Sequence, residues 1–244
     1  MIAELHDLKT TIKARASSLG FPLCGFTSAE SPAEYERYSS WLSNGYHAGM
    51  TYLDSAYHRS ARQDPKILFP GVKSIIVLGM PYRLTTRQEM QQSNAGVICG
   101  YAVEEDYHER IPKMLEPLAA LLQEISPTST PPRIFTDSAP ILERELGAYA
   151  GLGWIGKNSC LINPNLGSAF LLAELFTDVD IEPDAPYETD YCGTCERCIK
   201  ACPTSCILLD RTIDANRCIS YHSIENRGED RKSTRLNSSH ESPS

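Results

Sequence analysis

Four cysteines in the last quarter of the chain have the spacing of an iron–sulfur site. Cys192, Cys195, Cys198 and Cys202 are followed at once by Pro203, which gives the pattern C-x2-C-x2-C-x3-C-P. In bacterial ferredoxins, this spacing places three thiolates on one 4Fe–4S cluster and the fourth on a second cluster. Zinc sites favour two separated C-x2-C pairs, and a disulfide framework needs an oxidising compartment. The pattern therefore predicts electron transfer.

The cysteines after this motif do not complete two clusters. Each 4Fe–4S cluster takes four ligands, and Cys218 can supply a second ligand beside Cys202. Cys206 follows Cys202 closely, either as a spectator or as a substitute ligand. We therefore expect an incomplete ligand set for two clusters, with the remaining cysteines in a downstream run.

An acidic residue follows a short apolar segment in the middle of the chain. Residues 133–136 read as a strand that ends at Asp137, and residues 141–150 read as a helix. In open α/β sheets, ligands bind beyond the carboxyl ends of strands. Asp137 could be the N-cap of the helix. It could also be a general acid, because apolar surroundings disfavour the charged form of a carboxyl group. Both interpretations stay open on spacing alone.

Glycines and a histidine mark two further candidate loops. Residues 151–157 read G-L-G-W-I-G-K, but they follow an expected helix, so they fail the context of a dinucleotide-binding turn. Glycines still allow backbone to lie close to a large ligand. His108 follows another expected strand, and a lone histidine there is more often a surface or capping residue.

Apolar periodicity predicts alternating helices and strands over the first three quarters of the chain. Helices are expected at 4–19, 31–42, 108–125 and 141–150, and strands at 22–26, 74–80, 97–102, 133–136 and 169–176. The helix at 31–42 would open with Ser31 as its N-cap and Pro32 at its first position. The fold class is therefore α/β, followed by a partial ferredoxin-like domain.

These elements divide the chain into an α/β domain at 1–180, a linker at 181–190 and an iron–sulfur domain at 191–230. Residues 231–244 contain almost no apolar side chain, which is typical of a disordered tail. This tail resembles a translated cloning adapter, so we expect the native sequence to end near Asp230.

Composition and charge exclude several classes of protein. The chain has a net charge of −8, and 41% of its residues are hydrophobic. Neither the net charge nor the local charge around the cysteines suggests a nucleic-acid partner. No apolar run reaches the roughly 18 residues of a membrane span, and the N-terminus does not read as a secretory signal. We expect a cytoplasmic protein without a membrane partner.

Read in order, these segments resemble the epoxyqueuosine reductase family, cobalamin- and iron–sulfur-dependent enzymes of the last step of queuosine tRNA modification. The segments that carry the resemblance are 45–53, 69–77, 101–108, 137–144, 150–158, 161–168, 192–203 and 218–225.

The resemblance implies a role for each candidate residue. Asp137 matches the proton donor, and Cys218 matches a ligand of the second cluster. Arg62, Cys99, Lys157 and Ser168 match cofactor-binding positions, and Tyr107 and His108 match the substrate pocket.

The resemblance also implies cofactors and partners. These are cobalamin on the α/β domain, two 4Fe–4S clusters, a tRNA substrate and a low-potential electron donor, with the protein acting as a monomer. The family continues with further cysteines and, in many members, a helical extension. Because this chain lacks both, full activity is not expected of it alone. The alternatives are a reductive dehalogenase-like corrinoid enzyme and a ferredoxin-like electron carrier.

Overall fold

The computed structural model describes residues 2–84, 89, 99–127 and 130–227, with side chains from residue 8 onward. The expected tail at 231–244 lies outside the described residues. Among these residues, no helix has the length and apolar character that crossing a membrane requires.

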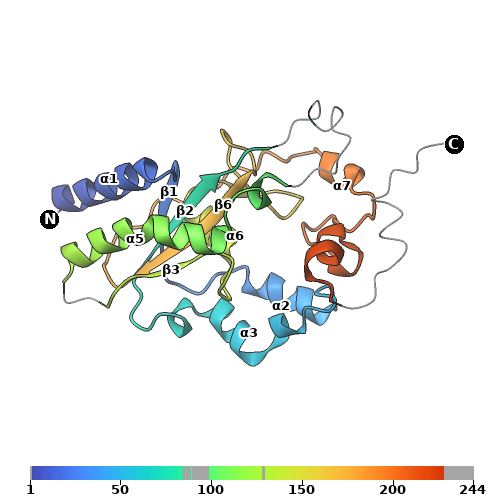
Figure 1. Cartoon of the computed structure of the whole chain (residues 1–244). Helices are drawn as coiled ribbons and strands as arrows, with labels where there is room; N and C mark the ends of the chain where they lie inside the picture. Colours follow the sequence, from blue (N-terminus) through green and yellow to red (C-terminus); the bar gives the residue numbers. More distant parts are fainter. Residues whose placement is uncertain (1, 85–88, 90–98, 128–129, 228–244) are drawn as a thin grey trace.

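A four-stranded sheet forms the centre of the chain (Figure 1). Its order is β1 (Leu23–Ser28), β2 (Ser74–Pro81), β6 (Phe170–Thr177) and β3 (Arg133–Phe135), and every neighbouring pair is antiparallel. The carboxyl-end rule for parallel sheets therefore does not apply here. Instead, the end of β2 meets the start of β6, where Pro81 pairs with Phe170.

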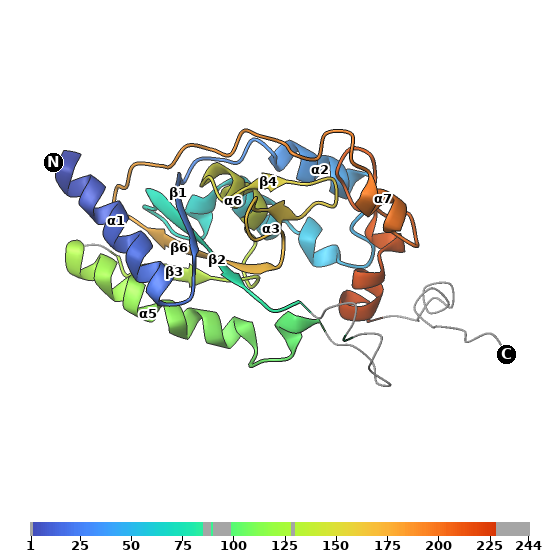
Figure 2. The ribbon, with the colours of Figure 1, turned by 90° about the horizontal axis from the view of Figure 1, so that it is seen from above.

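Helices cover both faces of this sheet (Figure 2). α1 (Ile2–Ser18) and α5 (Tyr107–Ile125) lie against one face, and α6 (Glu143–Tyr149) lies against the other. α2 (Tyr35–Ser43) and α3 (Ala56–Gln63) continue the second layer toward the C-terminal segment. The mixed helix and strand fold that the apolar pattern predicts is confirmed.

The side chains of the central strands point alternately to the two faces of the sheet, and they form one hydrophobic core on each face. Ile76 and Leu78 of β2 pack with α1 and α5, whereas Ile75 and Val77 pack on the α6 side. Successive side chains of a strand point to opposite faces, so an uninterrupted apolar strand fills both layers. Each such side chain contributes roughly 1.5–3 kcal/mol when it is fully buried. These two cores fix the sheet that carries the candidate site.

The start of one expected helix and the end of one expected strand are wrong. The helix expected from Ser31 begins only at Tyr35, because Pro32 to Glu34 form a turn in which the Pro32 carbonyl accepts the N–H of Tyr35. Residues Gly100–Ala102 form a 3-10 turn rather than the end of a strand. A Cβ at Gly100 would lie 1.7 Å from the Arg83 carbonyl oxygen, so backbone packs on backbone there. Residues 97 and 98 of that expected strand lie outside the described residues.

The C-terminal segment, residues 191–227 of the described chain, has short helical elements: α7 (Arg197–Ala201), η4 (Ala215–Arg217) and η5 (Tyr221–Glu225). Before the linker, β4 (Trp154–Ile155) and β5 (Leu161–Ile162) pair as a two-stranded sheet. Residues 181–190 run along the α/β layer as extended chain (Figure 2). Asp184 forms ion pairs with Lys9 at 2.5 Å and with Lys13 at 2.8 Å, so this stretch is fastened to the first helix.

Candidate functional site

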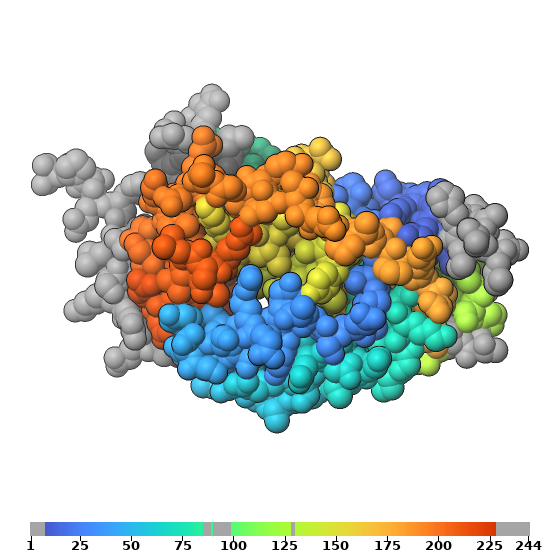
Figure 3. Space-filling view, turned by 180° about the vertical axis from the view of Figure 1, so that it is seen from behind, coloured from blue at the N-terminus to red at the C-terminus, as the bar shows by residue number. Residues whose placement is uncertain are grey.

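A cavity of about 760 Å³ lies between the α/β layer and the C-terminal segment. Its walls come from α2, α3, the start of α6, the start of β6 and residues 211–225. Figure 3 shows the molecule hollowed here, with yellow residues at the base between the blue N-terminal part and the orange to red C-terminal part. This volume is typical of small-molecule and cofactor sites.

Asp137 lies in the wall of this cavity on a strained loop. Its φ of 50° is in the left-handed region, which costs about 1–2 kcal/mol for a residue other than glycine. The Tyr107 hydroxyl donates a hydrogen bond to Asp137 Oδ2 at 2.7 Å. The N-cap of α6 is Leu142, without a side-chain cap, so the capping interpretation of Asp137 is wrong. The loop instead holds the carboxyl group against α5.

His108 is oriented toward the same carboxyl group. Asp106 is the N-cap of α5, and its Oδ1 lies 2.7 Å from His108 Nδ1. A proton on Nδ1 would leave Nε2 facing Asp137 Oδ2, 3.7 Å away. The Tyr107 and His108 rings stack at 4.0 Å. Asp137 Oδ2 therefore has one hydrogen-bond donor, Tyr107, and one ring nitrogen of His108 just beyond hydrogen-bond distance.

Arg62 places a guanidinium group in the wall of the cavity. It lies 5.2 Å from the centre of the Tyr38 ring, and its Nη1 is 3.0 Å from His58 Nδ1. Burial lowers the pKa of Arg62, but an arginine keeps its charge at any physiological pH. The cavity wall thus carries a fixed positive charge that interacts with its acids, Glu143 among them.

Two further acids stand behind Asp137. Glu143 begins α6, and its Oε1 accepts the N–H of Asp137 at 2.7 Å. Glu174 lies on β6 and is 0% exposed. Burial raises the pKa of Glu143 to about 7, partly offset by this hydrogen bond, and burial together with the charges of Glu143 and Asp137 raises the pKa of Glu174.

These raised pKa values predict that acid stabilises the fold through this pair. The folded protein keeps protons that unfolded glutamates release near their ordinary pKa, so stability is lost as pH rises from about 4.5 toward 7. Replacing Glu174 with Gln removes one acid from the pair, so stability should decrease less as the pH rises. Thermal midpoints at about pH 5 and about pH 8 measure it. If the thermal midpoint falls equally between the two pH values in the unaltered chain and in Glu174→Gln, the raised pKa values of this pair are contradicted.

The cavity brings together some of the residues expected from the sequence. Arg62, Tyr107, Asp137, Ser168 and Cys218 line it. Cys99 is exposed and outside the wall, and Lys157 donates instead to the Gly193 carbonyl at 2.8 Å. Lys157 therefore ties the glycine-rich turn to the cysteine loop.

The cysteine motif lies beside this cavity. Cys192 and Cys195 line an open hollow of about 560 Å³, and the Cys195 N–H donates to the Cys192 carbonyl at 2.7 Å. Within the described ranges, no three His, Cys, Asp or Glu side chains lie close enough together to hold a metal ion. Soft thiolates in this spacing fit a 4Fe–4S cluster by their chemistry.

Cys202 and Cys206 lie together, with 3.4 Å between their sulfur atoms. Partial burial opposes ionisation of Cys202, but hydrogen bonds from Thr204 and Cys206 outweigh it and lower its pKa to about 6. Burial and the contact with Cys202 raise the pKa of Cys206 to about 12. The contact joins Cys206 to the motif, and its role as a spectator or as a substitute ligand stays a prediction.

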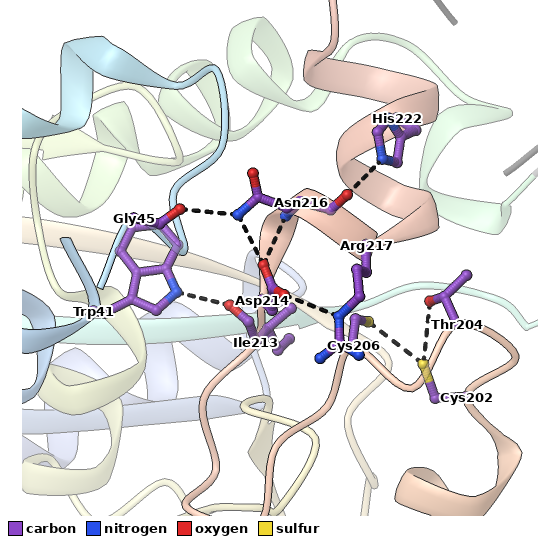
Figure 4. A network of polar contacts seen from close by, with 10 residues as sticks. All are labelled: Trp41, Gly45, Cys202, Thr204, Cys206, Ile213, Asp214, Asn216, Arg217 and His222. Carbon is purple, nitrogen blue, oxygen red and sulfur yellow. Dashed lines mark hydrogen bonds and ion pairs between the residues drawn. The ribbon is translucent and has the colours of Figure 1, made fainter. Parts of the chain in front are cut away.

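Polar contacts fasten the C-terminal segment to α2 and the loop after it (Figure 4). Trp41 Nε1 donates to the Ile213 carbonyl at 2.7 Å, and Asn216 Nδ2 donates to the Gly45 carbonyl at 2.9 Å. The Gly49 N–H donates to the Tyr221 hydroxyl at 3.0 Å, where a Cβ on Gly49 would lie 2.5 Å from that oxygen. These contacts hold Cys218 at the cavity.

Replacing Trp41 with Phe should loosen this segment. The variant keeps most of the ring but leaves the Ile213 carbonyl without its donor. One such hydrogen bond is worth about 1 kcal/mol, so cleavage within residues 206–226 in limited proteolysis should quicken about fivefold. Tyr57→Phe, on an exposed ring of α3, is the matched control. Unchanged cleavage in Trp41→Phe would contradict the fastening role.

Sequence reasoning did not assign a role to Glu174, to Glu143 or to the aromatic wall of Tyr38, Trp41 and Tyr52. A single glutamate inside the apolar strand F-L-L-A-E-L-F-T was the available signal for Glu174. The aromatic residues come from α2 and the turn after it, which only the fold brings to the cavity.

The fold and the cysteine motif define a protein with a mixed α/β domain followed by an iron–sulfur cluster-binding domain, and residues 191–241 match the 4Fe-4S double cluster binding domain. Residues 62–138 match the family model "Epoxyqueuosine reductase QueG, DUF1730". An epoxyqueuosine reductase of Cyclobacterium marinum is 45% identical over 217 residues, which cover 88% of this chain and 68% of that protein. The chain belongs to the epoxyqueuosine reductase family.

Solved structures agree with this membership. An epoxyqueuosine reductase with a tRNA-Tyr epoxyqueuosine-modified stem loop has a TM-score of 0.83 and 27% identity, over 96% of this chain and 61% of that one. A Bacillus subtilis epoxyqueuosine reductase with a catalytic aspartate loop swung out of the active site has a TM-score of 0.81 and 27% identity, over 96% and 61%. The chain spans 62–71% of the length of three curated relatives.

Proposed function

We propose that this chain carries the catalytic part of an enzyme that reduces epoxyqueuosine to queuosine in tRNA. The observation that carries the proposal is Asp137, held by Tyr107 in the wall of a cavity that the cysteine-bearing segment closes. A relative bound to an epoxyqueuosine-modified stem loop supports the substrate class.

Asp137 is the proposed acid of the reaction. Removing an epoxide oxygen requires protons, and a carboxyl group aimed into the cavity can protonate that oxygen as it departs. Tyr107 donates to Asp137 Oδ2 and so orients the other oxygen toward the cavity. His108 would help to hold this carboxyl group. Tyr107 and His108 would together form one side of the substrate pocket.

The cavity also fits the corrinoid that the family resemblance implies. Its walls combine apolar residues of β6 with the Arg62 cation and the Ser168 hydroxyl, which suits a large ring with polar edges. Bound cobalamin would supply the low-potential metal chemistry, and the protein supplies position and protons. Arg62 and Ser168 would contact this cofactor, with Cys99 and Lys157 toward its periphery.

The cysteine segment is the proposed path for electrons. Cys192, Cys195 and Cys198 would hold one 4Fe–4S cluster, and Cys202 and Cys218 would contribute to a second. We place these in an iron–sulfur domain at 191–230, joined by the 181–190 linker to the cofactor-binding domain at 1–180. The protein would act as a monomer in the cytoplasm, and a low-potential electron donor would supply its electrons.

Family membership favours this function over a reductive dehalogenase-like enzyme or a ferredoxin-like carrier. The test is anaerobic reconstitution of the chain with iron, sulfide and cobalamin, followed by iron analysis, the visible corrinoid spectrum and turnover of an epoxyqueuosine-modified stem loop. Bound corrinoid with product formation supports the proposal. Folded chain that binds iron but no corrinoid would contradict it and favour the carrier.

A further inference from the structure

The stoichiometry of epoxide removal exceeds what one acid can supply. Converting an epoxide to an alkene breaks two C–O bonds, and it consumes two electrons and two protons as the oxygen leaves as water. Asp137 carries one proton, so a second must reach the cavity. This inference rests on the proposed function, with the electrons coming from its low-potential donor.

Glu174 is placed where an ionised carboxylate is costly. It shares a strand face with Leu172 and Phe176, which pack on the α6 side of the sheet. Among the described residues, no N–H or O–H group donates to either carboxylate oxygen of Glu174. A buried charge without donors or a counter-ion is strongly disfavoured, so Glu174 holds a proton.

Glu143 joins this buried acid to the cavity. Its carboxyl group interacts with that of Glu174, and it also lines the cavity beside Asp137. Two carboxyl groups that interact in a buried place cannot both ionise without strong repulsion, so at least one of them keeps a proton. The other charged or titratable groups that interact with Glu143 include Asp137, Arg144, Arg62 and Tyr107. The two arginines favour release of a proton from Glu143, and Asp137 opposes it.

We infer that Glu143 and Glu174 form a proton store for Asp137, and that Glu143 delivers the second proton of the reaction. Asp137 gives its proton to the epoxide oxygen while the first C–O bond breaks. Glu143 then protonates the Asp137 carboxylate through water in the cavity that both groups line. Asp137 passes this proton to the hydroxyl group, which leaves as water while the second C–O bond breaks. Solvent protons refill the pair after release of the product.

The first test measures where the protons are. The chain is labelled with ¹³C at the glutamate side-chain carboxyl carbons and titrated by NMR from about pH 4 to about pH 9. We expect one resonance to titrate near pH 7, far from the ordinary value of about 4.3, and a second to stay protonated. Glu143→Gln should remove the first of these, and Glu174→Gln should shift it to lower pH.

Glu116→Gln is the control, because this side chain is exposed on α5. It should remove a different resonance and leave the shifted one unchanged. If every glutamate titrates near the ordinary value, or if the shifted resonance survives in both Glu143→Gln and Glu174→Gln, the proton store is refuted.

The second test measures delivery. We expect the rate of the unaltered chain to fall above pH 7; Glu143→Gln should lower turnover by about 100-fold and remove this fall. If Glu143→Gln keeps full turnover while Asp137→Asn is inactive, Glu143 does not deliver the second proton. The proposed function is then unaffected. No turnover in the unaltered chain, with corrinoid bound and a strong chemical reductant supplying the electrons in place of the clusters, contradicts the proposed function and delivery with it. The NMR titration still decides whether the pair stores a proton.

Discussion

Replacing Asp137 with Asn is expected to lower turnover by about 100- to 10,000-fold, which is the usual contribution of a positioned general acid. The amide keeps the size of the carboxyl group and still accepts the hydrogen bond from Tyr107. It cannot release a proton to a departing oxygen. Turnover of a modified stem loop and the visible corrinoid spectrum measure the two consequences separately, because binding should be nearly unchanged.

Two comparisons make this expectation sharp. Ser138→Ala changes the next residue of the same loop, which also lines the cavity, and removes no acid. If Ser138→Ala is as slow as Asp137→Asn, the loss comes from a disturbed loop rather than from a missing proton. Normal turnover in Asp137→Asn would show that the acid is another group.

The sequence predicted the parts of the fold that depend on local pattern. The apolar run from Ser74 to Met80 was read as a buried strand, and the structure has β2 over Ser74–Pro81. The helix at 108–125 is α5, one residue longer at its start. In both segments, the apolar spacing matches the period of the element, so tertiary contacts reinforce what the local sequence favours.

The failures come from contacts between distant segments. Ser31 looked like an N-cap, but the chain makes a turn there before α2 begins. The capping interpretation of Asp137 failed because its hydrogen-bond partner, Tyr107, lies 30 positions earlier, on another helix. Periodicity cannot show which loop meets which helix. The resemblance to a family predicts the role of Asp137, and the structure shows which residues surround it.

Replacing Cys195 with Ser is expected to remove the first cluster and abolish turnover. Cys195 is the second of the four motif cysteines and is exposed at the hollow that Cys192 also lines. A serine hydroxyl is a poor substitute for a soft thiolate on iron, so the cluster loses one of its few ligands. Iron content per chain and the visible cluster absorbance after anaerobic reconstitution measure the loss.

Cys24→Ser is the matched control for this experiment. Burial raises the pKa of Cys24 to about 12, and β1 lies outside both the cavity wall and the cysteine hollow. This variant should keep its iron. Cys195→Ser should still fold, because Trp41, Asn216 and Tyr221 fasten the C-terminal segment without any contact from the motif cysteines. A Cys195→Ser chain with full iron and normal turnover would place the first cluster on other ligands.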